Sequence, residues 1–360
     1  MLNRTMRKRL FCLWSQLISI FFLAGCHAVP ASLREGNLPV AAELQATPVS
    51  LPGGSAGIGF DDLLYSPQLK QVIVPAGRTG SLDLVDPQTL QVTALNGFSA
   101  QDQFGGGHGD GTTSADFGRG YLFAIDRTGM QLDVVDLASK TIAARAPLTS
   151  SPDYVRFVEA TGEVWVTEPD SEQIEVFSLG SSQPPTPTAV GVIHVSGGPE
   201  SLVIDPTRQQ AYTHLWAGVT VAINLKTRTL VSKWSNGCIS SRGIALDETR
   251  GFLFAGCVEG KVFVLDVEHD GRQLSNFGYG LGVDVISYNP KLGHLYLPAA
   301  SSESMAILGV SASGELTLLG TVKTAQDAHC VTADEQGNAW VCDPSKGQLL
   351  LVKDTLPPTK

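Results

Sequence analysis

A six-residue strand motif recurs seven times along this 360-residue chain and predicts an all-β, seven-bladed β-propeller. The final residues of successive copies are 50, 42, 46, 42, 43 and 44 residues apart. A period in the forties that is built from short strands is typical of propeller blades, whereas solenoid repeats are shorter or helical. The copies occupy residues 81–86, 131–136, 173–178, 219–224, 261–266, 304–309 and 348–353.

Each repeat carries the signals of four antiparallel strands. An apolar stretch such as 201–204 runs into an Asp-Pro, Asn-Pro or Asp-Glu turn, and a second strand such as 251–255 returns from it. The six-residue motif and a more polar strand then complete the unit. Four tryptophans fall at strand positions, where we expect them to pack between blades: Trp165, Trp216, Trp234 and Trp340.

The first 25 residues have the pattern of an export signal that ends in a lipobox. Basic residues precede an apolar run from about residue 10 to residue 23, and Ser15 and Gln16 interrupt this run too early for a membrane-spanning helix. The sequence Leu-Ala-Gly-Cys ends the segment at Cys26. By resemblance to bacterial lipoproteins, the chain is cut before Cys26, and this cysteine carries the lipid that anchors the protein.

The residue after Cys26 favours one membrane over the other. In enterobacterial lipoproteins an Asp at this position signals retention at the inner membrane, and this chain has His27. We therefore expect the protein in the bacterial cell envelope, lipid-anchored in the periplasm, with the outer membrane favoured over the inner. Residues 26–43 are then a lipidated tether, residues 44–354 the propeller and residues 355–360 a C-terminal tail.

The charge of the chain argues against nucleic acid as a partner. The formal net charge is −10, and removal of residues 1–25 takes away four positive charges and no acidic residue, which leaves about −14. An acidic surface repels phosphate backbones, and the sequence has no basic stripe or run. We expect a monomer whose partner is a protein or a small-molecule ligand.

The seventh repeat has only three strands, because seven residues remain after its motif. Residues 44–51 look like the outer strands at 90–95 and 316–320, so we expect this N-terminal segment to supply the missing strand. The pairing would leave no sheet edge in the circle without a neighbour. Pro48 fits only an outer, exposed strand.

Two pairs of cysteines are expected to form disulfides within single blades, because an even number remains after Cys12 leaves and Cys26 is lipidated. Cys330 and Cys342 flank a turn centred on residue 336, so a tight hairpin places them opposite each other. A metal site of these two cysteines with His329 is the alternative, although neighbouring strand residues point to opposite faces.

The second pair, Cys238 with Cys257, has a less regular geometry. In a hairpin centred near residue 249, residue 241 lies opposite Cys257, so Cys238 has to fold back from the loop that enters the blade.

One residue from each blade is expected at the mouth of the central channel. The innermost strands of a propeller line its axis, and ligands usually enter on the face that carries the connections between blades. Aligning the repeats on their turns places at this mouth Asp61, a residue near Asp110, Tyr154 beside Asp153, Glu200, Arg242, Asp284 and His329. Titratable groups that share one ring perturb one another's pKa values and could hold a hard cation through carboxylate oxygens. The alternative is that polar residues only cap a solvent-filled channel.

The longest interval between motifs locates an insertion at residues 97–114, between the first two blades. This connection crosses the face that carries the mouth. Three glycines before His108 permit close backbone approach, and His108 with Asp110 would add an imidazole and a carboxylate near the ring. The alternative is a flexible surface loop with an incidental histidine.

The repeats resemble the YVTN-type propeller repeats of YncE-like proteins. Residues 242–248 (Arg-Gly-Ile-Ala-Leu-Asp-Glu) and 253–266 carry the resemblance, which covers about residues 57–353. The resemblance implies a propeller but no particular activity, since the family includes proteins of unassigned activity and the wider fold hosts both enzymes and scaffolds.

The sequence favours a membrane-anchored periplasmic propeller that binds a protein partner or a small ligand at its funnel face, without assigned catalysis or cofactor. The alternative is a metal-dependent hydrolase or lyase that resembles lactone-hydrolysing propellers. In that case Asp61, Glu200 and Asp284 would hold a divalent cation, Ca²⁺ or Zn²⁺, and His108 or His329 would carry the proton.

Overall fold

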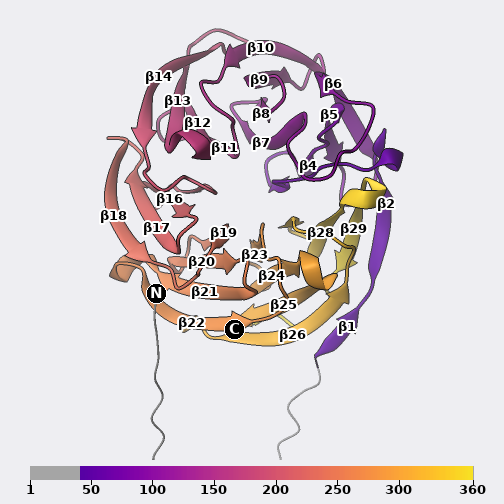
Figure 1. The fold of residues 1–360 in the computed structure, drawn as a ribbon, viewed down its shortest axis with the longest axis vertical. Helices are drawn as coiled ribbons and strands as arrows, with labels where there is room; N and C mark the ends of the chain where they lie inside the picture. Colours follow the sequence, from indigo (N-terminus) through magenta and orange to yellow (C-terminus); the bar gives the residue numbers. More distant parts are fainter. Residues whose placement is uncertain (1–40, 360) are drawn as a thin grey trace, which may run out of the picture. The chain divides into compact units, whose positions relative to one another are not determined.

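A computed structural model describes residues 41–359 and places their strands in seven sheets around a central axis (Figure 1). The predicted signal peptide, the predicted lipidation site Cys26 and most of the predicted tether lie outside the described residues. Each sheet holds four antiparallel strands ordered from the axis outward, and one sheet has a fifth, parallel strand at its outer edge, so the predicted seven-bladed propeller is confirmed. No helix among residues 41–359 is long and apolar enough to cross a bilayer.

The first four blades each consist of four consecutive strands. Blade one contains β3 (Leu64–Ser66), β4 (Gln71–Pro75), β5 (Thr79–Val85) and β6 (Val92–Ala100). Blade two contains β7 (Thr112–Gly118), β8 (Tyr121–Asp126), β9 (Gln131–Asp136) and β10 (Thr141–Pro147). Blade three contains β11 (Val155–Val158), β12 (Glu163–Glu168), β13 (Gln173–Leu179) and β14 (Pro187–His194). Blade four contains β15 (Val203–Asp205), β16 (Gln210–Leu215), β17 (Val219–Asn224) and β18 (Thr229–Ser235).

The last three blades include the two strands that begin the described chain. Blade five contains β19 (Ser241–Asp247), β20 (Phe252–Cys257), β21 (Lys261–Asp266) and β22 (Arg272–Gly278). Blade six contains β23 (Ser287–Asn289), β24 (His294–Ala299), β25 (Ser304–Val310), β26 (Leu316–Lys323) and, as a fifth strand, β1 (Ala42–Leu44). Blade seven contains β27 (Val331–Ala333), β28 (Asn338–Asp343), β29 (Gln348–Lys353) and β2 (Ala46–Ser50). Five short 3₁₀ turns join these strands: η1 (Gly54–Ala56), η2 (Pro169–Ser171), η3 (Val267–His269), η4 (Ala300–Ser302) and η5 (Pro344–Lys346).

All seven copies of the sequence motif lie on the third strand of a blade. The interior of these strands is buried, as in β9, because each sheet packs on a neighbouring blade through both faces. The outer strands alternate exposed and partly buried residues, as β10 does over 141–145. The repeat in the sequence thus reflects burial: the third strand of each blade is apolar because it is buried on both faces, and the outer strand alternates because one of its faces is exposed.

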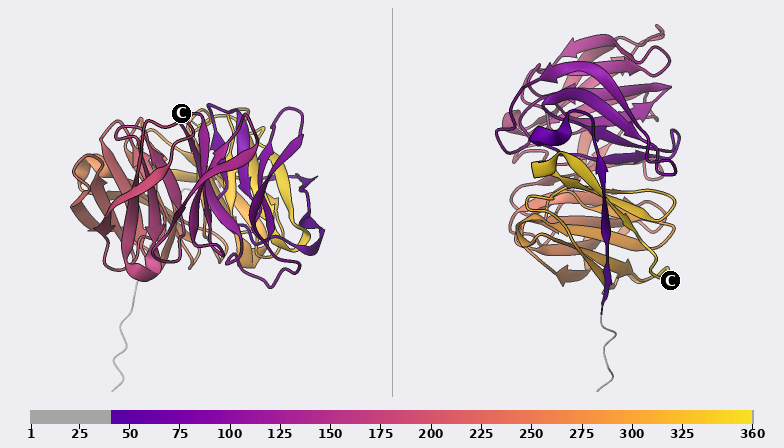
Figure 2. Two further views of the ribbon diagram at one scale, coloured as in Figure 1. Left: turned by 90° about the horizontal axis from the view of Figure 1, so that it is seen from above. Right: turned by 90° about the vertical axis from the view of Figure 1, so that its right-hand side faces the viewer.

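The N-terminal segment fastens to two blades. Strand β2 pairs antiparallel with β29, with Val49 opposite Leu349, and thereby occupies the place that the sequence analysis expected for this segment. The expected single strand 44–51 is wrong in detail, because β1 ends at Leu44 and pairs in parallel with β26 of blade six, with Ala42 opposite Gly320. In the right-hand view of Figure 2 the indigo segment runs along the outside of the yellow sheet of blade seven. Pro48 is exposed on the outer edge, as expected.

The C-terminal residues also contact blade six. Asp354 accepts hydrogen bonds from the Tyr296 hydroxyl (2.8 Å) and from His294 Nδ1 (2.7 Å), and both residues belong to β24. The Thr359 amide donates to the Leu292 carbonyl oxygen (2.8 Å). Residues 355–359, predicted as a tail, therefore pack on the propeller.

Both predicted disulfides are confirmed. Cys330 and Cys342 lie opposite each other with their Cα atoms 5.6 Å apart, so the alternative in which they hold a metal with His329 is wrong. Cys238 and Cys257 have a Cα–Cα distance of 5.3 Å, and residue 241 lies opposite Cys257 as the hairpin register required.

Substituting Val49 with Asp tests the pairing of β2 with β29. Val49 is 7% exposed and packs with Trp340 and Leu351, so a carboxylate there should lower the free energy of unfolding by about 3 kcal/mol. Thr47→Asp is the control, because Thr47 is exposed on the same strand and should change stability by less than about 0.5 kcal/mol. Urea denaturation measures both, and equal effects of the two substitutions would contradict the pairing.

Asp83 should make stability depend on pH, because burial raises the pKa of this carboxyl to about 7. Its Oδ1 accepts from the Ser81 hydroxyl (2.8 Å), and its Oδ2 has no partner among the described residues. Between about pH 4 and pH 7 the unfolded chain has lost this proton while the folded chain keeps it, so the Asp83 contribution to stability falls as pH rises. The Asp83→Asn substitution removes this carboxyl. The free energy of unfolding of the variant, relative to that of the wild type, should therefore be higher at pH 8 than at pH 4 by about 2–4 kcal/mol.

Asp86→Asn serves as the matched control for this pH effect. The backbone N–H groups of Thr89 and Gln88 lower the pKa of Asp86, so its amide variant should gain no stability at pH 8. Thermal unfolding at both pH values measures the difference, and an Asp83→Asn effect that is the same at pH 4 and pH 8 would contradict a raised pKa.

Candidate binding site at the mouth of the channel

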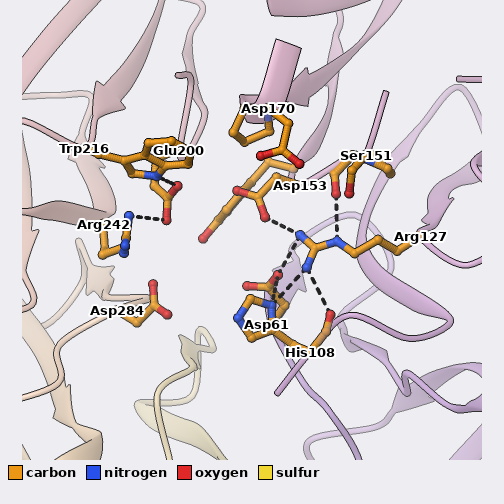
Figure 3. A pocket seen from close by; sticks show the side chains of 13 residues that line it. Asp61, His108, Arg127, Ser151, Asp153, Asp170, Glu200, Trp216, Arg242 and Asp284 are labelled. Carbon is orange, nitrogen blue, oxygen red and sulfur yellow. Dashed lines mark hydrogen bonds and ion pairs between the residues drawn. The ribbon is translucent and has the colours of Figure 1, made fainter. Parts of the chain in front are cut away.

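A cavity of about 290 Å³ opens at the mouth of the central channel (Figure 3). Most of its residues lie in the connections that enter the inner strands of the blades, and others lie in turns between second and third strands. The lining residues are Asp61, His108, Arg127, Ser151, Pro152, Asp153, Tyr154, Pro169, Asp170, Glu200, Trp216, Arg242 and Asp284. Five carboxylates thus face two guanidinium groups and one imidazole.

Arg127 is the centre of the polar network on one side of the cavity. Its Nε donates to the Pro152 carbonyl oxygen (2.8 Å), and its Nη1 donates to the His108 carbonyl oxygen (3.0 Å). Its Nη2 pairs with Asp61 Oδ2 (3.3 Å) and with Asp153 Oδ1. Arg127 therefore joins the inserted loop to the connections that enter blades one and three.

The charges of this network set its protonation. His108 Nδ1 lies 2.9 Å from Asp61 Oδ2, and the Asp61 charge and hydrogen bond raise the pKa of His108 to about 9. Burial favours the neutral form of Asp61, but His108 and Arg127 outweigh it, so the pKa of Asp61 is lowered. Burial and the neighbouring Asp61 charge raise the pKa of Asp153 well above its usual range. Of the two carboxyl groups that contact Arg127, Asp61 is thus the one that stays charged, and Asp153 is the one that keeps its proton.

A second polar group lies across the cavity. Arg242 Nη1 lies 3.0 Å from Glu200 Oε1, and the Trp216 indole N–H donates to Glu200 Oε2. The Arg242 guanidinium carbon also lies 5.9 Å from the centre of the Trp216 ring. Burial raises the pKa of Glu200 to about 7, against the lowering effect of Arg242.

The structure brings most of the residues predicted for the mouth to this one cavity. Asp61, His108, Asp153, Tyr154, Glu200, Arg242 and Asp284 all line it. His329 lies next to it, with its ring centre 5.4 Å from that of His108. Asp110 does not line it, because its Oδ1 accepts from Gln101 Nε2 (2.7 Å) within the inserted loop.

The carboxylate trio predicted for a metal is not brought together. Asp61 and Glu200 are engaged by arginines on opposite sides of the cavity, as described above. The ligand atoms that do converge with Asp284 come from His108 and His329, and all three lie within 4.8 Å of one another. The group therefore has two imidazoles and one carboxylate, a different donor set from the predicted one.

Sequence reasoning missed several residues of the mouth and channel, among them Arg127, Trp216 and Arg156. Arg127 lies in the turn between β8 and β9, and only its position between the second and third strands of a repeat could have placed it on the mouth face. Trp216 occupies the corresponding turn of blade four and is 40% exposed, so its predicted packing between blades is wrong. Arg156 forms an ion pair with Asp62 across the inner strands, with Nη1 2.6 Å from Oδ2.

Comparison with known proteins identifies the fold and no family. No family model matches the sequence, and no curated protein matches it either. The resemblance to YVTN-type repeats thus remains a hypothesis.

Solved structures match over most of the chain at low sequence identity. A chain of the mitotic checkpoint complex has 13% identity and a TM-score of 0.69 and covers 95% of this chain and 99% of its own. Kuenenia stuttgartiensis hydrazine synthase has 12% identity and a TM-score of 0.63, with coverages of 92% and 100%. The β-propeller domain of Myceliophteria thermophila Cps50 (Swd1) has 10% identity and a TM-score of 0.66, with coverages of 83% and 97%. At these identities the similarity establishes that the chain has a β-propeller fold.

Proposed function

We propose that the protein is a binding module that captures a partner protein at the mouth of its channel. The partner would place a lysine or arginine side chain in the cavity and apolar side chains on the exposed surface beside it. The observation that carries this proposal is that a cavity lined by five carboxyl groups and an apolar surface lie on the same face of the propeller.

The apolar surface consists of four exposed side chains, which we call the apolar arc. They are Trp216 (40% exposed), Ile239 (80%), Val258 (38%) and Leu281 (57%). Each lies either in a turn between the second and third strands of a blade or in a connection between blades, and both kinds of loop belong to the mouth face. Exposed apolar groups of this kind, gathered beside a polar cavity, are typical of protein-binding sites.

The loops that carry the apolar arc are joined to one another. The Ser241 amide donates to the Trp216 carbonyl oxygen (3.2 Å), the Val258 amide to the Ser240 carbonyl oxygen (3.0 Å), and the Gly282 amide to the Val258 carbonyl oxygen (3.0 Å). The disulfide between Cys238 and Cys257 connects the residues directly before Ile239 and Val258. A surface held in place before binding loses little conformational entropy when a partner docks.

The carboxylates that no arginine engages select the partner. Asp61, Asp153 and Glu200 pair with the two arginines, whereas Asp170 and Asp284 form no ion pair among the described residues and offer carboxylate oxygens to a cationic side chain. One of the structurally similar chains belongs to the mitotic checkpoint complex, an assembly of proteins, and this supports protein binding as the general role. A lysine or arginine flanked by apolar residues would satisfy both the cavity and the arc.

We place this activity at a membrane of the bacterial cell envelope. The support is the sequence Leu-Ala-Gly-Cys after an apolar run, together with the four cysteines that form two disulfides, as expected in an oxidising compartment. A lipid on Cys26 would hold the propeller near its partners in the periplasm.

A photo-crosslinking amino acid at position 239 tests the partner site in living cells. p-Benzoylphenylalanine in place of Ile239 should give an adduct whose partner peptide contains Lys or Arg beside apolar residues. The same amino acid in place of Lys226, an exposed residue in the turn between β17 and β18 on the opposite face, is the control and should give no such adduct.

Two further substitutions make the crosslinking result specific. Leu281→Asp alters the apolar arc and Asp170→Lys reverses an exposed charge of the cavity, and each should reduce the adduct at least about tenfold. An adduct that survives both substitutions, or that forms equally at position 226, would contradict the proposal.

Cys26→Ala tests the membrane anchor. The variant should move from the membrane fraction to the soluble fraction and should no longer incorporate an alkyne-labelled fatty acid, because the lipidated sulfur is missing. Cys12→Ala, within the predicted signal, is the control and should leave the membrane localisation and the fatty-acid labelling unchanged. Fatty-acid labelling that persists in the Cys26→Ala variant would contradict lipidation at this residue.

A further inference from the structure

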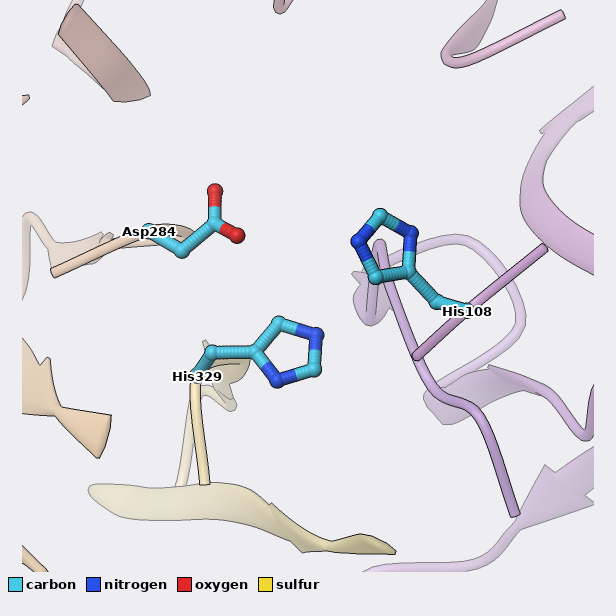
Figure 4. A group of neighbouring side chains, drawn as sticks. All are labelled: His108, Asp284 and His329. Carbon is cyan, nitrogen blue, oxygen red and sulfur yellow. The ribbon is translucent and has the colours of Figure 1, made fainter. Parts of the chain in front are cut away.

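We propose that the protein binds a divalent transition-metal ion, Zn²⁺ first among them, between His108, Asp284 and His329. The three side chains point toward a common point (Figure 4), and their ligand atoms lie within 4.8 Å of one another. Two imidazoles and one carboxylate form a donor set that suits zinc and related ions. Two of its ligands, His108 and Asp284, also line the cavity of the proposed function, but the site does not depend on a partner protein.

The spacing of the three ligand atoms fits a single ion after small movements. Atoms no more than 4.8 Å apart can share an ion placed within about 2.8 Å of each, and bonds to zinc measure about 2.0–2.2 Å. Each side chain thus has to move by less than about 1 Å. Such a movement is within the reach of His108 and His329, because neither histidine is fully buried.

The second nitrogen of each imidazole is already oriented as in metal sites. His108 Nδ1 lies 2.9 Å from Asp61 Oδ2 and 3.0 Å from Arg127 Nη1, and His329 Nδ1 donates to the Asp327 carbonyl oxygen at 2.7 Å. Histidines that bind metals almost always donate their other N–H to a carboxylate or a backbone carbonyl in this way. In Figure 4 both Nε2 atoms face the space between the rings and Asp284, and an ion that binds there displaces the second proton of the His108 ring.

A backbone carbonyl adds a further observation. His329 Nε2 lies 3.0 Å from the Phe60 carbonyl oxygen. When His329 Nδ1 carries the ring proton, Nε2 and this oxygen are both acceptors and face each other without a hydrogen between them. A cation bound to both atoms satisfies them, and so does a second proton on the ring. The distance between the two atoms is that of neighbouring ligands on one ion.

The three ligands come from parts of the chain that the ion would join. His108 belongs to the inserted loop between blades one and two, whereas Asp284 and His329 enter blades six and seven. The loop backbone is packed tightly there, because a Cβ atom at Gly59 would collide with the Gly107 carbonyl oxygen. A bound ion would therefore fasten the glycine-rich loop across the mouth of the channel.

Calorimetric titration of the chelator-treated full chain with ZnCl₂ tests this proposal. We expect one equivalent of Zn²⁺ to bind with a dissociation constant in the micromolar range or below. His108→Ala and His329→Ala should each weaken binding at least about tenfold, and Asp61→Asn about 10–100-fold through the orientation of His108. Ca²⁺ should not compete, since it takes oxygen ligands.

The control is His194→Ala, because His194 is exposed on the outer strand β14 and should not affect zinc binding. Thermal unfolding of each variant without metal shows that it is folded, and Zn²⁺ should raise the melting temperature of the wild type and of His194→Ala only. The proposal is overturned by a wild type that binds no stoichiometric Zn²⁺, or by unchanged affinity in the His108→Ala, His329→Ala double variant. Crosslinking at position 239 in the presence of a chelator tests the partner site separately.

Discussion

The pairing of β2 with β29 is the constraint on which the rest of the structure depends. The C-terminal part of the chain provides only three strands for blade seven, and the strand that completes this sheet comes from about 300 residues earlier in the chain. Closing a ring in this way leaves no blade with an unpacked face and links the two ends of the propeller. This closure holds the seven inner strands, and the connections that carry the residues of the mouth, around one axis.

Both ends of the described chain add contacts to blade six. Strand β1 extends this sheet in parallel beside β26, and residues 354–359 pack on β24 and the turn before it. Blades six and seven, where the ring closes, are thus held by strand pairing, by a buried Asp354–His294 contact and by the disulfide in blade seven. These contacts keep Asp284 and His329, which enter the same two blades, near the loop that carries His108.

The repeat period was sufficient to predict the blades, the third strands and most residues of the mouth, and the turn centred on residue 336 predicted that Cys330 lies opposite Cys342. A fixed number of strands per repeat places the residues before each inner strand on the same face, so Asp61, Glu200 and Asp284 could be aligned without a structure. The partners of these carboxylates could not be predicted in this way. Arg127 reaches the cavity from a turn through a long side chain, and Asp110 accepts a hydrogen bond from Gln101 within the inserted loop instead of lining the cavity. Such contacts depend on loop conformation, which the period of the strands does not determine.

The mouth combines three environments within one ring. Arg127 fixes a buried network on one side, Arg242 and Trp216 hold Glu200 on the other, and the apolar arc lies outside them on disulfide-linked loops. Buried ion pairs of this kind add little net stability, but they hold side chains in one geometry. We therefore interpret the mouth as a preformed surface for recognition.

Hydrogen–deuterium exchange of the full chain tests the closure of the ring most directly. The account predicts that the backbone amides of residues 46–50 that face β29 exchange as slowly as those of β29 itself, because both open only when blade seven unfolds. Complete exchange of residues 46–50 within seconds, while β29 remains protected, would show that the N-terminal strand is not part of the ring and would contradict the account.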